Sequence, residues 1–451
     1  MNQFLPRPRI PFRADVPVPA TSRPAVIDRA DLLCLGALLL AYVAILMVLS
    51  ANLVWPYWAQ NDADQYHLPQ VQWFREHGLT FDYASSTATT PAFHWLMASL
   101  ADATGAPQPL ARADLLARIV PGVLTAVTLG VLYAAMRSLG ASAGRSALLI
   151  APFFSSSYVW AAAAYPVTEG LAQIGYAAMA LAMARPAPSA AAFGFGALVA
   201  TATRQLFWPA AAAYPLMLLL QAGRDVFRPA NLVRIALACG PATLILAVFV
   251  AIWGGLSPPE FSHHRAEQTI NIGAAVHGVM ILGVFGLVFL RLEDFADRRR
   301  VAIEIAVCVV LAGLIWLSLP LASSPQEAGG RVYSVVWVLS DHSPMLLDRP
   351  VSSLGLVFGG LFMMAVAWRR ARKAGEIPGE LLLYGCYALA QAGQFLSLQR
   401  YVEPAALLFL AMSLARLRRP APVGDALLAL AFAGWFAVSM GRLTGVIGGA
   451  G

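Results

Sequence analysis

The feature that most constrains this chain is a series of apolar stretches, each about long enough to cross a lipid bilayer. A spanning α-helix needs about 20 mostly apolar residues. We identify about thirteen such stretches, at approximately residues 31–54, 112–137, 145–162, 166–184, 189–203, 206–222, 231–253, 271–290, 300–321, 351–368, 379–398, 402–416 and 424–441. The sequence therefore predicts an all-α, polytopic integral membrane protein.

The composition excludes a soluble protein of ordinary type. Apolar residues make up 59% of the 451 residues and charged residues only 12%, and the mean hydropathy is +0.66. A soluble domain carries about 25% charged residues, which cover its surface. Lipid must therefore cover most of this chain. We expect a disordered cytoplasmic tail over residues 1–30 and a single transmembrane domain over residues 31–451.

The positions of the basic residues predict an orientation. Cytoplasmic connections of membrane proteins are enriched in Lys and Arg. If the Arg-rich N-terminus is cytoplasmic, every large basic cluster falls on the same side as the tail. These clusters contain Arg137 and Arg145, Arg185, Arg224 to Arg234, Arg291 to Arg300, Arg369 to Lys373, and Arg416 to Arg419. The net charge of +7 therefore indicates topology rather than nucleic-acid binding.

The opposite, outer side then holds three longer loops, at residues 56–111, 254–270 and 322–350. In the first loop, residues 67–77 and a segment that begins near Thr90 and Pro91 each carry one apolar stripe, which predicts two short amphipathic helices at the membrane interface. Gly78 is suited to end the first of them. The third loop could fold over a site as a lid.

Two carboxylates, Asp62 and Asp64, follow the first predicted span directly. An ionisable residue near a membrane is costly unless it is solvated, paired or functional. A carboxylate at the edge of a cavity can accept a proton from a hydroxyl group, as a general base does. The alternative is a solvated loop whose acids only mark the outer side.

Arg204 and Arg400 lie on the outer side in this topology, against the general distribution of basic residues. Arginine offers a fork of donors that suits a phosphate group. The alternative is structural pairing, of Arg204 with Glu169 or of Arg400 with Glu403. In the second outer loop, His264 and Arg265 could bind a phosphate or could belong to an interfacial polar loop.

The segment around these acids resembles a known family. Asp62 to Pro69, D-A-D-Q-Y-H-L-P, is similar to the first outer loop of the GT-C fold glycosyltransferases that use lipid-phosphate sugars. It is most similar to the dolichyl-phosphate-glucose alpha-1,2-glucosyltransferases. Their pattern of an acidic pair, F-H-I-P-Q-A-Q and T-T-P-P resembles Tyr66 to Gln72 and Thr89 to Pro91 here. Their later R-Q-T-N and R-Y-F patterns resemble Arg204 to Phe207 and Arg400 to Val402.

The chain departs from that pattern in two places. The family has adjacent acids, whereas this chain spaces them as Asp62 and Asp64, and Ala92 replaces the second proline of T-T-P-P. The identity of the base therefore stays open between the two acids, and the broader bacterial-type pattern favours Asp62. The glucose specificity is open for the same reason.

The resemblance implies a GT-C-like helix bundle and an inverting transfer of a hexose, in the first place glucose. The donor is a polyprenyl phosphate, and the acceptor is a lipid-linked or cell-envelope glycan outside a bacterial inner membrane. The implied catalytic residues are Asp62 and Asp64. The implied donor-phosphate ligands are Arg204, Arg400, His264 and Arg265. The implied acceptor or sugar ligands are His67, Gln70, Glu169, Gln205 and Tyr401.

We expect no cofactor, although a divalent metal ion between the donor phosphate and the acids is an open alternative. No nucleic-acid partner is expected. Two other classes of function compete with sugar transfer. A transporter or flippase of lipid-linked sugars would have broken helices and charges near the bilayer midplane. A non-catalytic membrane subunit with the same fold would tolerate replacement of Asp62 and Asp64.

Overall fold

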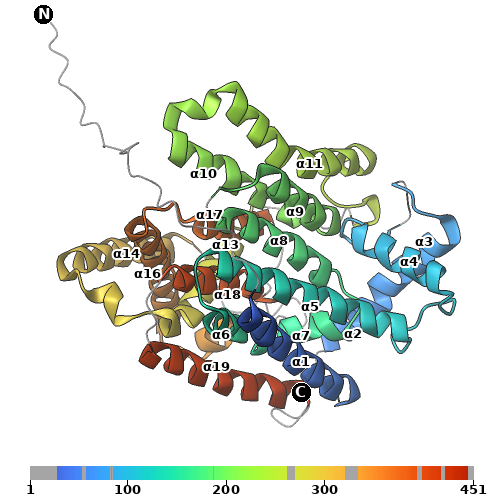
Figure 1. The fold of residues 1–451 in the computed structure, drawn as a ribbon, viewed down its shortest axis with the longest axis horizontal. Helices are drawn as coiled ribbons and strands as arrows, with labels where there is room; N and C mark the ends of the chain where they lie inside the picture. The colour runs from blue at the N-terminus through green and yellow to red at the C-terminus, as the bar shows by residue number, and fades with distance from the viewer. Residues whose placement is uncertain are drawn as a thin grey trace, which may run out of the picture.

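The computed structural model describes residues 28–52, 57–81, 83, 85–185, 187–261, 270–319, 334–393, 399–417 and 422–444. Nearly all of this described part is helical (Figure 1). Within it, the strands are limited to one hairpin, in which β1 (Met345–Leu346) pairs antiparallel with β2 (Arg349–Pro350). The prediction of an all-α fold is confirmed.

Eight helical segments of the described part are long and apolar enough to cross a bilayer. Six of them lie in the single helices α1 (Arg29–Asn52), α5 (Leu115–Ser138), α11 (Pro229–Trp253), α14 (Arg298–Ser318), α16 (Val351–Lys373) and α19 (Pro422–Leu443). The other two are composite: η2 (Gln205–Ala212) with α10 (Ala213–Ala222) and η3 (Gly223–Phe227), and α13 (Ile272–Gly286) with η5 (Leu287–Phe289). The chain is thus a multi-pass membrane protein by helix length and composition.

The other predicted spans coincide with shorter or broken helices. The predicted span 145–162 is two helices, α6 (Ala143–Phe154) and α7 (Ser157–Ala164), which meet at a bend of 83°. Four more predicted spans correspond to α8 (Glu169–Ala184), α9 (Ala190–Thr203), α17 (Gly379–Ala390) and α18 (Gln399–Ala415). By helix length, the described part supports eight crossings, or nine with the bent pair, and the predicted count of thirteen is not confirmed.

Short elements complete the described chain. Those of the first outer loop are α2 (Tyr57–Asp62), η1 (Ala63–His67), α3 (Leu68–His77) and α4 (Ala92–Thr104). Those elsewhere are η4 (Pro259–Phe261), η6 (Leu292–Phe295), α15 (Val335–Asp341) and η8 (Gln391–Gly393). The η1 segment is a single π-helical turn, a form often found at functional sites.

The two short helices predicted for the first outer loop are present as α3 and α4, and α3 continues α2 and η1 without a break. Gly78 ends α3 with a positive φ of 81°, as glycine does readily. Thr90 does not cap α4, whose N-cap is Pro91. The Thr90 hydroxyl instead donates to the carbonyl oxygen of Thr201 at 2.7 Å, because α4 packs against α9 and the buried hydroxyl bonds across that contact.

The bundle is built around α18. Every residue from Val402 to Ala415 is buried, as expected for a helix that is apolar on all sides. Glycines allow other helices to approach closely: a Cβ atom on Gly360 of α16 would overlap the Val279 carbonyl oxygen of α13, and one on Gly194 of α9 would overlap the Leu237 carbonyl oxygen of α11. Small residues at such crossings are typical of membrane helix bundles.

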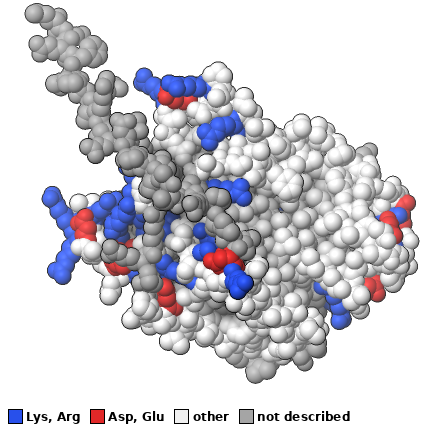
Figure 2. Space-filling model, viewed as in Figure 1, with Lys and Arg blue, Asp and Glu red and all other residues white. Residues whose placement is uncertain are grey.

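Charged side chains are distributed unevenly along the length of the molecule. Figure 2 shows Lys and Arg gathered over the ends of α10, α14 and α16, on the left of the view, and a mainly uncharged middle. The exposed basic residues at these ends are Arg224, Arg228, Arg298, Arg299, Arg300, Arg372 and Lys373. The opposite end carries α3 and α4 (Figure 1). An apolar belt between two polar ends is what a membrane requires.

Candidate functional site

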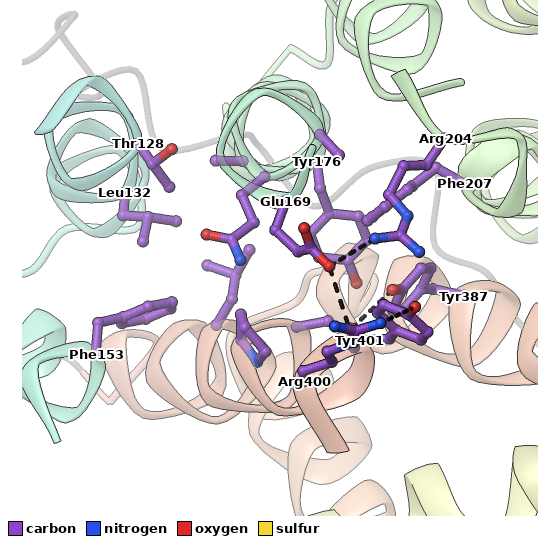
Figure 3. Close-up of a pocket in the computed structure, with 16 residues that line it drawn as sticks. Thr128, Leu132, Phe153, Glu169, Tyr176, Arg204, Phe207, Tyr387, Arg400 and Tyr401 are labelled. Atoms are coloured by element: carbon purple, nitrogen blue, oxygen red, sulfur yellow. Dashed lines mark hydrogen bonds and ion pairs between the residues drawn. The ribbon is translucent and has the colours of Figure 1, made fainter. Parts of the chain in front are cut away.

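The candidate site is a pocket among α5, α6, α8, η2, α17 and α18, close to α2 (Figure 3). Most of its wall is apolar or aromatic, with Leu132, Phe153, Tyr176, Phe207 and Tyr387 on it. The cavity volume is about 30 Å³, which is room for about two water molecules. A ligand with a long apolar chain therefore enters only if lining side chains move.

One end of the pocket carries a chain of ion pairs. The Nη1 atom of Arg204 donates to Glu169 Oε1 at 2.7 Å. Arg400 lies between two acids: its Nη1 donates to Asp62 Oδ2 at 2.6 Å, and its Nε is 4.0 Å from Glu169 Oε1. The four side chains, Asp62, Arg400, Glu169 and Arg204, form the acid–arginine cluster, and their formal charges sum to zero.

Aromatic rings hold both guanidinium groups in place. Arg204 stacks on the ring of Tyr401 at 4.2 Å, and Arg400 stacks on Trp58 at 4.3 Å. The Nη2 atom of Arg400 also donates to the Tyr401 hydroxyl at 2.8 Å. Stacking on an aromatic face stabilises an arginine while its edge stays available for ligands. The sequence did not single out Trp58, although its position between the first span and Asp62 could have drawn attention to it.

The acid–arginine cluster is not saturated with hydrogen bonds. The buried atoms Arg400 Nε and Glu169 Oε2 have no hydrogen-bond partner in the described part of the chain. A buried polar atom without a partner costs about 1–3 kcal/mol, and more if charged. Such atoms at the wall of a pocket indicate a position where a polar ligand or water binds.

Local structure explains how these side chains reach one pocket. Glu169 is the first residue of α8, where the helix dipole favours a negative charge. Arg204 ends α9 in an extended conformation, which breaks the apolar segment and turns its side chain toward α8. Arg400 lies in the first turn of α18, and Asp62 lies at the junction of α2 and η1 within a continuous helical run. The cluster is therefore assembled from the ends of three helices and the interior of a fourth.

Asp64 points away from this cluster, because η1 carries residues two apart on roughly opposite sides. Its carboxylate pairs with Arg112 at 3.2 Å. Asp62 and Asp64 thus do not converge on one ion. Among the residues that the structure describes, no group of three or more His, Cys, Asp or Glu side chains could hold a metal ion.

Two other predicted ligands, His67 and Gln70, lie within the helical run from α2 to α3. His67 is buried and its Nδ1 lies 3.0 Å from Nε2 of His94. Burial lowers the pKa of His67 to about 4, against the opposing effects of Glu169 and Asp62. Gln70 accepts from the backbone N–H of Ser86 at 2.8 Å.

Gln205 is tied to the backbone rather than to the pocket. Its amide donates to the carbonyl oxygens of Ala88 and Leu256, at 2.6 and 2.9 Å. His264, Arg265 and residues 322–333 of the predicted lid lie outside the described residues. The described remainder of that loop contains α15 and the β1–β2 hairpin.

Of the predicted site residues, the structure brings five together: Asp62, Glu169, Arg204, Arg400 and Tyr401. The aromatic wall of Tyr176, Phe207 and Tyr387 was not predicted, because apolar residues in apolar helices carry no signal of their own. Comparison with protein-family models, with curated proteins and with solved structures found no significant match to this chain.

Proposed function

We propose that this protein is an inverting glycosyltransferase. It transfers a hexose, in the first place glucose, from a polyprenyl-phosphate donor to a lipid-linked or cell-envelope glycan. We place the reaction at the non-cytoplasmic face of a bacterial inner membrane. The observation that carries the proposal is the joining of two guanidinium groups and an unsaturated hydrogen-bond cluster to an apolar pocket. A polyprenyl phosphate combines an anion with an apolar chain in the same way.

In the proposed reaction, the acceptor hydroxyl oxygen attacks the anomeric carbon from the side opposite the phosphate. The carbon–oxygen bond to the phosphate breaks, and polyprenyl phosphate leaves with the electron pair. Asp62 accepts the hydroxyl proton. The leaving group is already a stable anion, so it needs cations rather than an acid, and Arg204 and Arg400 supply them.

The Asp62–Arg400 ion pair implies an order in which the donor and the acceptor are engaged. While the pair is closed, the Asp62 Oδ2 atom accepts a hydrogen bond from Arg400 and does not face the acceptor. A donor phosphate that draws Arg400 toward itself releases the carboxylate to face the acceptor. Donor binding would therefore precede activation of the acceptor.

Transfer is tested with purified protein, a labelled polyprenyl-phosphate-glucose donor and candidate lipid acceptors. We expect transfer by the wild type and a loss of at least about 100-fold with Asp62→Asn, since general-base catalysis contributes about 10²–10⁴-fold. Asp225→Asn is the matched control, because Asp225 is an exposed acid at the opposite end. Transfer by Asp62→Asn at the wild-type rate would remove Asp62 as the base, and Asp64→Asn would then be tested.

A transporter of lipid-linked sugars is the second candidate, favoured by the 83° break between α6 and α7, since broken helices are common in transporters. The same donor, reconstituted into vesicles, distinguishes the two functions. A transporter moves the intact donor between leaflets without releasing polyprenyl phosphate. A non-catalytic subunit shows neither activity.

A further inference from the structure

A second pocket lies beside α2, whose Gln60 side chain lines it. Its wall is mainly polar, and the cavity volume is about 160 Å³. It lies among the end of α1, α2, the start of α5 and the end of α7, and is lined by Ser50, Gln60, Arg112, Arg118, Ala164 and Tyr165. We call it the rim pocket. It shares no lining residue with the first pocket.

The rim pocket carries an excess of positive charge. Arg112 is partly exposed and pairs with Asp64 at 3.2 Å. Arg118 is exposed, and its side chain has no ion-pair or hydrogen-bond partner among the described residues. The formal charges of Arg112, Arg118 and Asp64 sum to +1.

The helix dipole does not explain the position of Arg118. It lies in the first turn of α5, where the helix dipole disfavours a positive charge. It also lies at the end of the molecule away from the main basic surface. A cation in such a place is better explained by an anion that binds to it.

The remaining polar wall can support an anion. The Gln60 amide donates to the Tyr165 hydroxyl at 2.8 Å, and one further amide N–H of this group stays available. The guanidinium group of Arg112 lies 5.9 Å from the centre of the Tyr165 ring. Both side chains line the pocket. Two guanidinium groups and an amide match the several acceptor oxygens of a phosphate group.

The surroundings of the rim pocket favour a lipid as the source of that phosphate. Next to Ser50, Met47 of α1 is 69% exposed, and next to Arg118, Leu115 and Ile119 of α5 are 73% and 49% exposed. These apolar side chains flank the cationic pocket and belong to helices that are long and apolar enough to cross a bilayer. A phosphate-bearing headgroup in the pocket would leave its acyl chains on this apolar surface.

We propose that the rim pocket binds the anionic phosphate headgroup of a membrane lipid through Arg112 and Arg118. The Asp64 carboxylate competes with that headgroup for Arg112. This proposal does not depend on sugar transfer, because Arg112 and Arg118 have no role in the proposed reaction and lipid binding requires no reaction.

The test is native mass spectrometry of the purified protein with phosphatidylglycerol, phosphatidylcholine or inorganic phosphate as the probe. We expect Arg112→Gln/Arg118→Gln to weaken phosphatidylglycerol binding by about 10-fold or more, as for two charge-assisted hydrogen bonds. Asp64→Asn should strengthen it by about 2- to 5-fold, since an exposed ion pair of about 0.5–1 kcal/mol is removed. Phosphatidylcholine, which has no net charge, should bind more weakly.

Arg299→Gln is the matched control, because Arg299 is exposed at the opposite end of the molecule. Equal phosphatidylglycerol binding by the wild type and the double variant would overturn the proposal, provided both have the same Tm. Binding of inorganic phosphate that the double variant loses, without any such loss for phosphatidylglycerol, would overturn the lipid source and assign the pocket to a free anion.

Discussion

Arg400 joins parts of the chain that are 338 residues apart in sequence, through its hydrogen bond to Asp62. It also contacts Trp58, Tyr401 and Glu169. A lysine would keep the positive charge but would lose the planar fork that reaches Asp62 and Tyr401 together. The identity of this residue, and not only its charge, is therefore central to the site.

We predict that Arg400→Lys lowers the rate of sugar transfer by about 10- to 100-fold, the loss expected for one charge-assisted hydrogen bond of about 1.5–3 kcal/mol. Initial rates with labelled donor measure the effect. Arg299→Lys, at an exposed position, is the control for loss of an arginine. A rate within about twofold of the wild type would show that charge alone suffices.

His67 predicts a pH dependence of stability. Its pKa in the folded protein is about 4 because of burial, whereas an unfolded histidine has a pKa of about 6.5. Between these values the unfolded state binds more protons, so stability falls as the pH falls through 6.5. The loss approaches about 3 kcal/mol near pH 4.

The measurement is the Tm in detergent from pH 7.5 to pH 4.5. Because the pKa of buried His94 is also lowered, the double variant His67→Gln/His94→Gln should show a flatter pH profile than the wild type. An equally steep profile in both proteins would assign the acid sensitivity to other groups.

At the scale of elements, the contact between α13 and α16 is set by glycines. A Cβ atom on Gly360 would overlap the Val279 carbonyl oxygen, whereas one on Gly355 of the same helix would meet nothing within 4 Å. We predict that Gly360→Ala lowers the free energy of unfolding by about 1–3 kcal/mol, as other overpacked sites do. Gly355→Ala should leave the Tm unchanged or raise it, since alanine favours helix. Equal losses of Tm would argue against close packing at Gly360.

The elements were more predictable than the site. Apolar length alone located the long helices, because the bilayer fixes how long they must be. It did not reveal the 83° break between α6 and α7, since both halves are equally apolar. The predicted pairing of Arg400 with Glu403 is wrong. Glu403 accepts a hydrogen bond from Gln399, one turn earlier in the same helix. Arg400 pairs instead with Asp62, which is distant in sequence. The Arg204–Glu169 pair was among the predicted alternatives and is confirmed.

At the scale of the whole molecule, ion pairs concentrate at the end with the basic surface. Arg370 pairs with Asp294 and Arg416 with Glu380, both at 2.6 Å and nearly inaccessible to solvent. Removing one partner of a buried pair costs about 3–5 kcal/mol. The helices at this end are therefore held together by buried charged contacts. The exposed basic residues around these contacts, such as Arg298 and Arg299, form the charged surface of this end.

The orientation of these ends is the last prediction. An odd number of predicted spans separates α4 from Arg299, and the basic end should be cytoplasmic. With the four native cysteines replaced by alanine, a single cysteine is introduced at exposed Ala103 or at exposed Arg299. A membrane-impermeant maleimide should label Ala103→Cys in intact cells, and Arg299→Cys only after lysis. The reverse pattern would place Asp62 and both pockets on the cytoplasmic side. Sugar transfer at the outer face would then be impossible for these residues, whatever their activity in detergent.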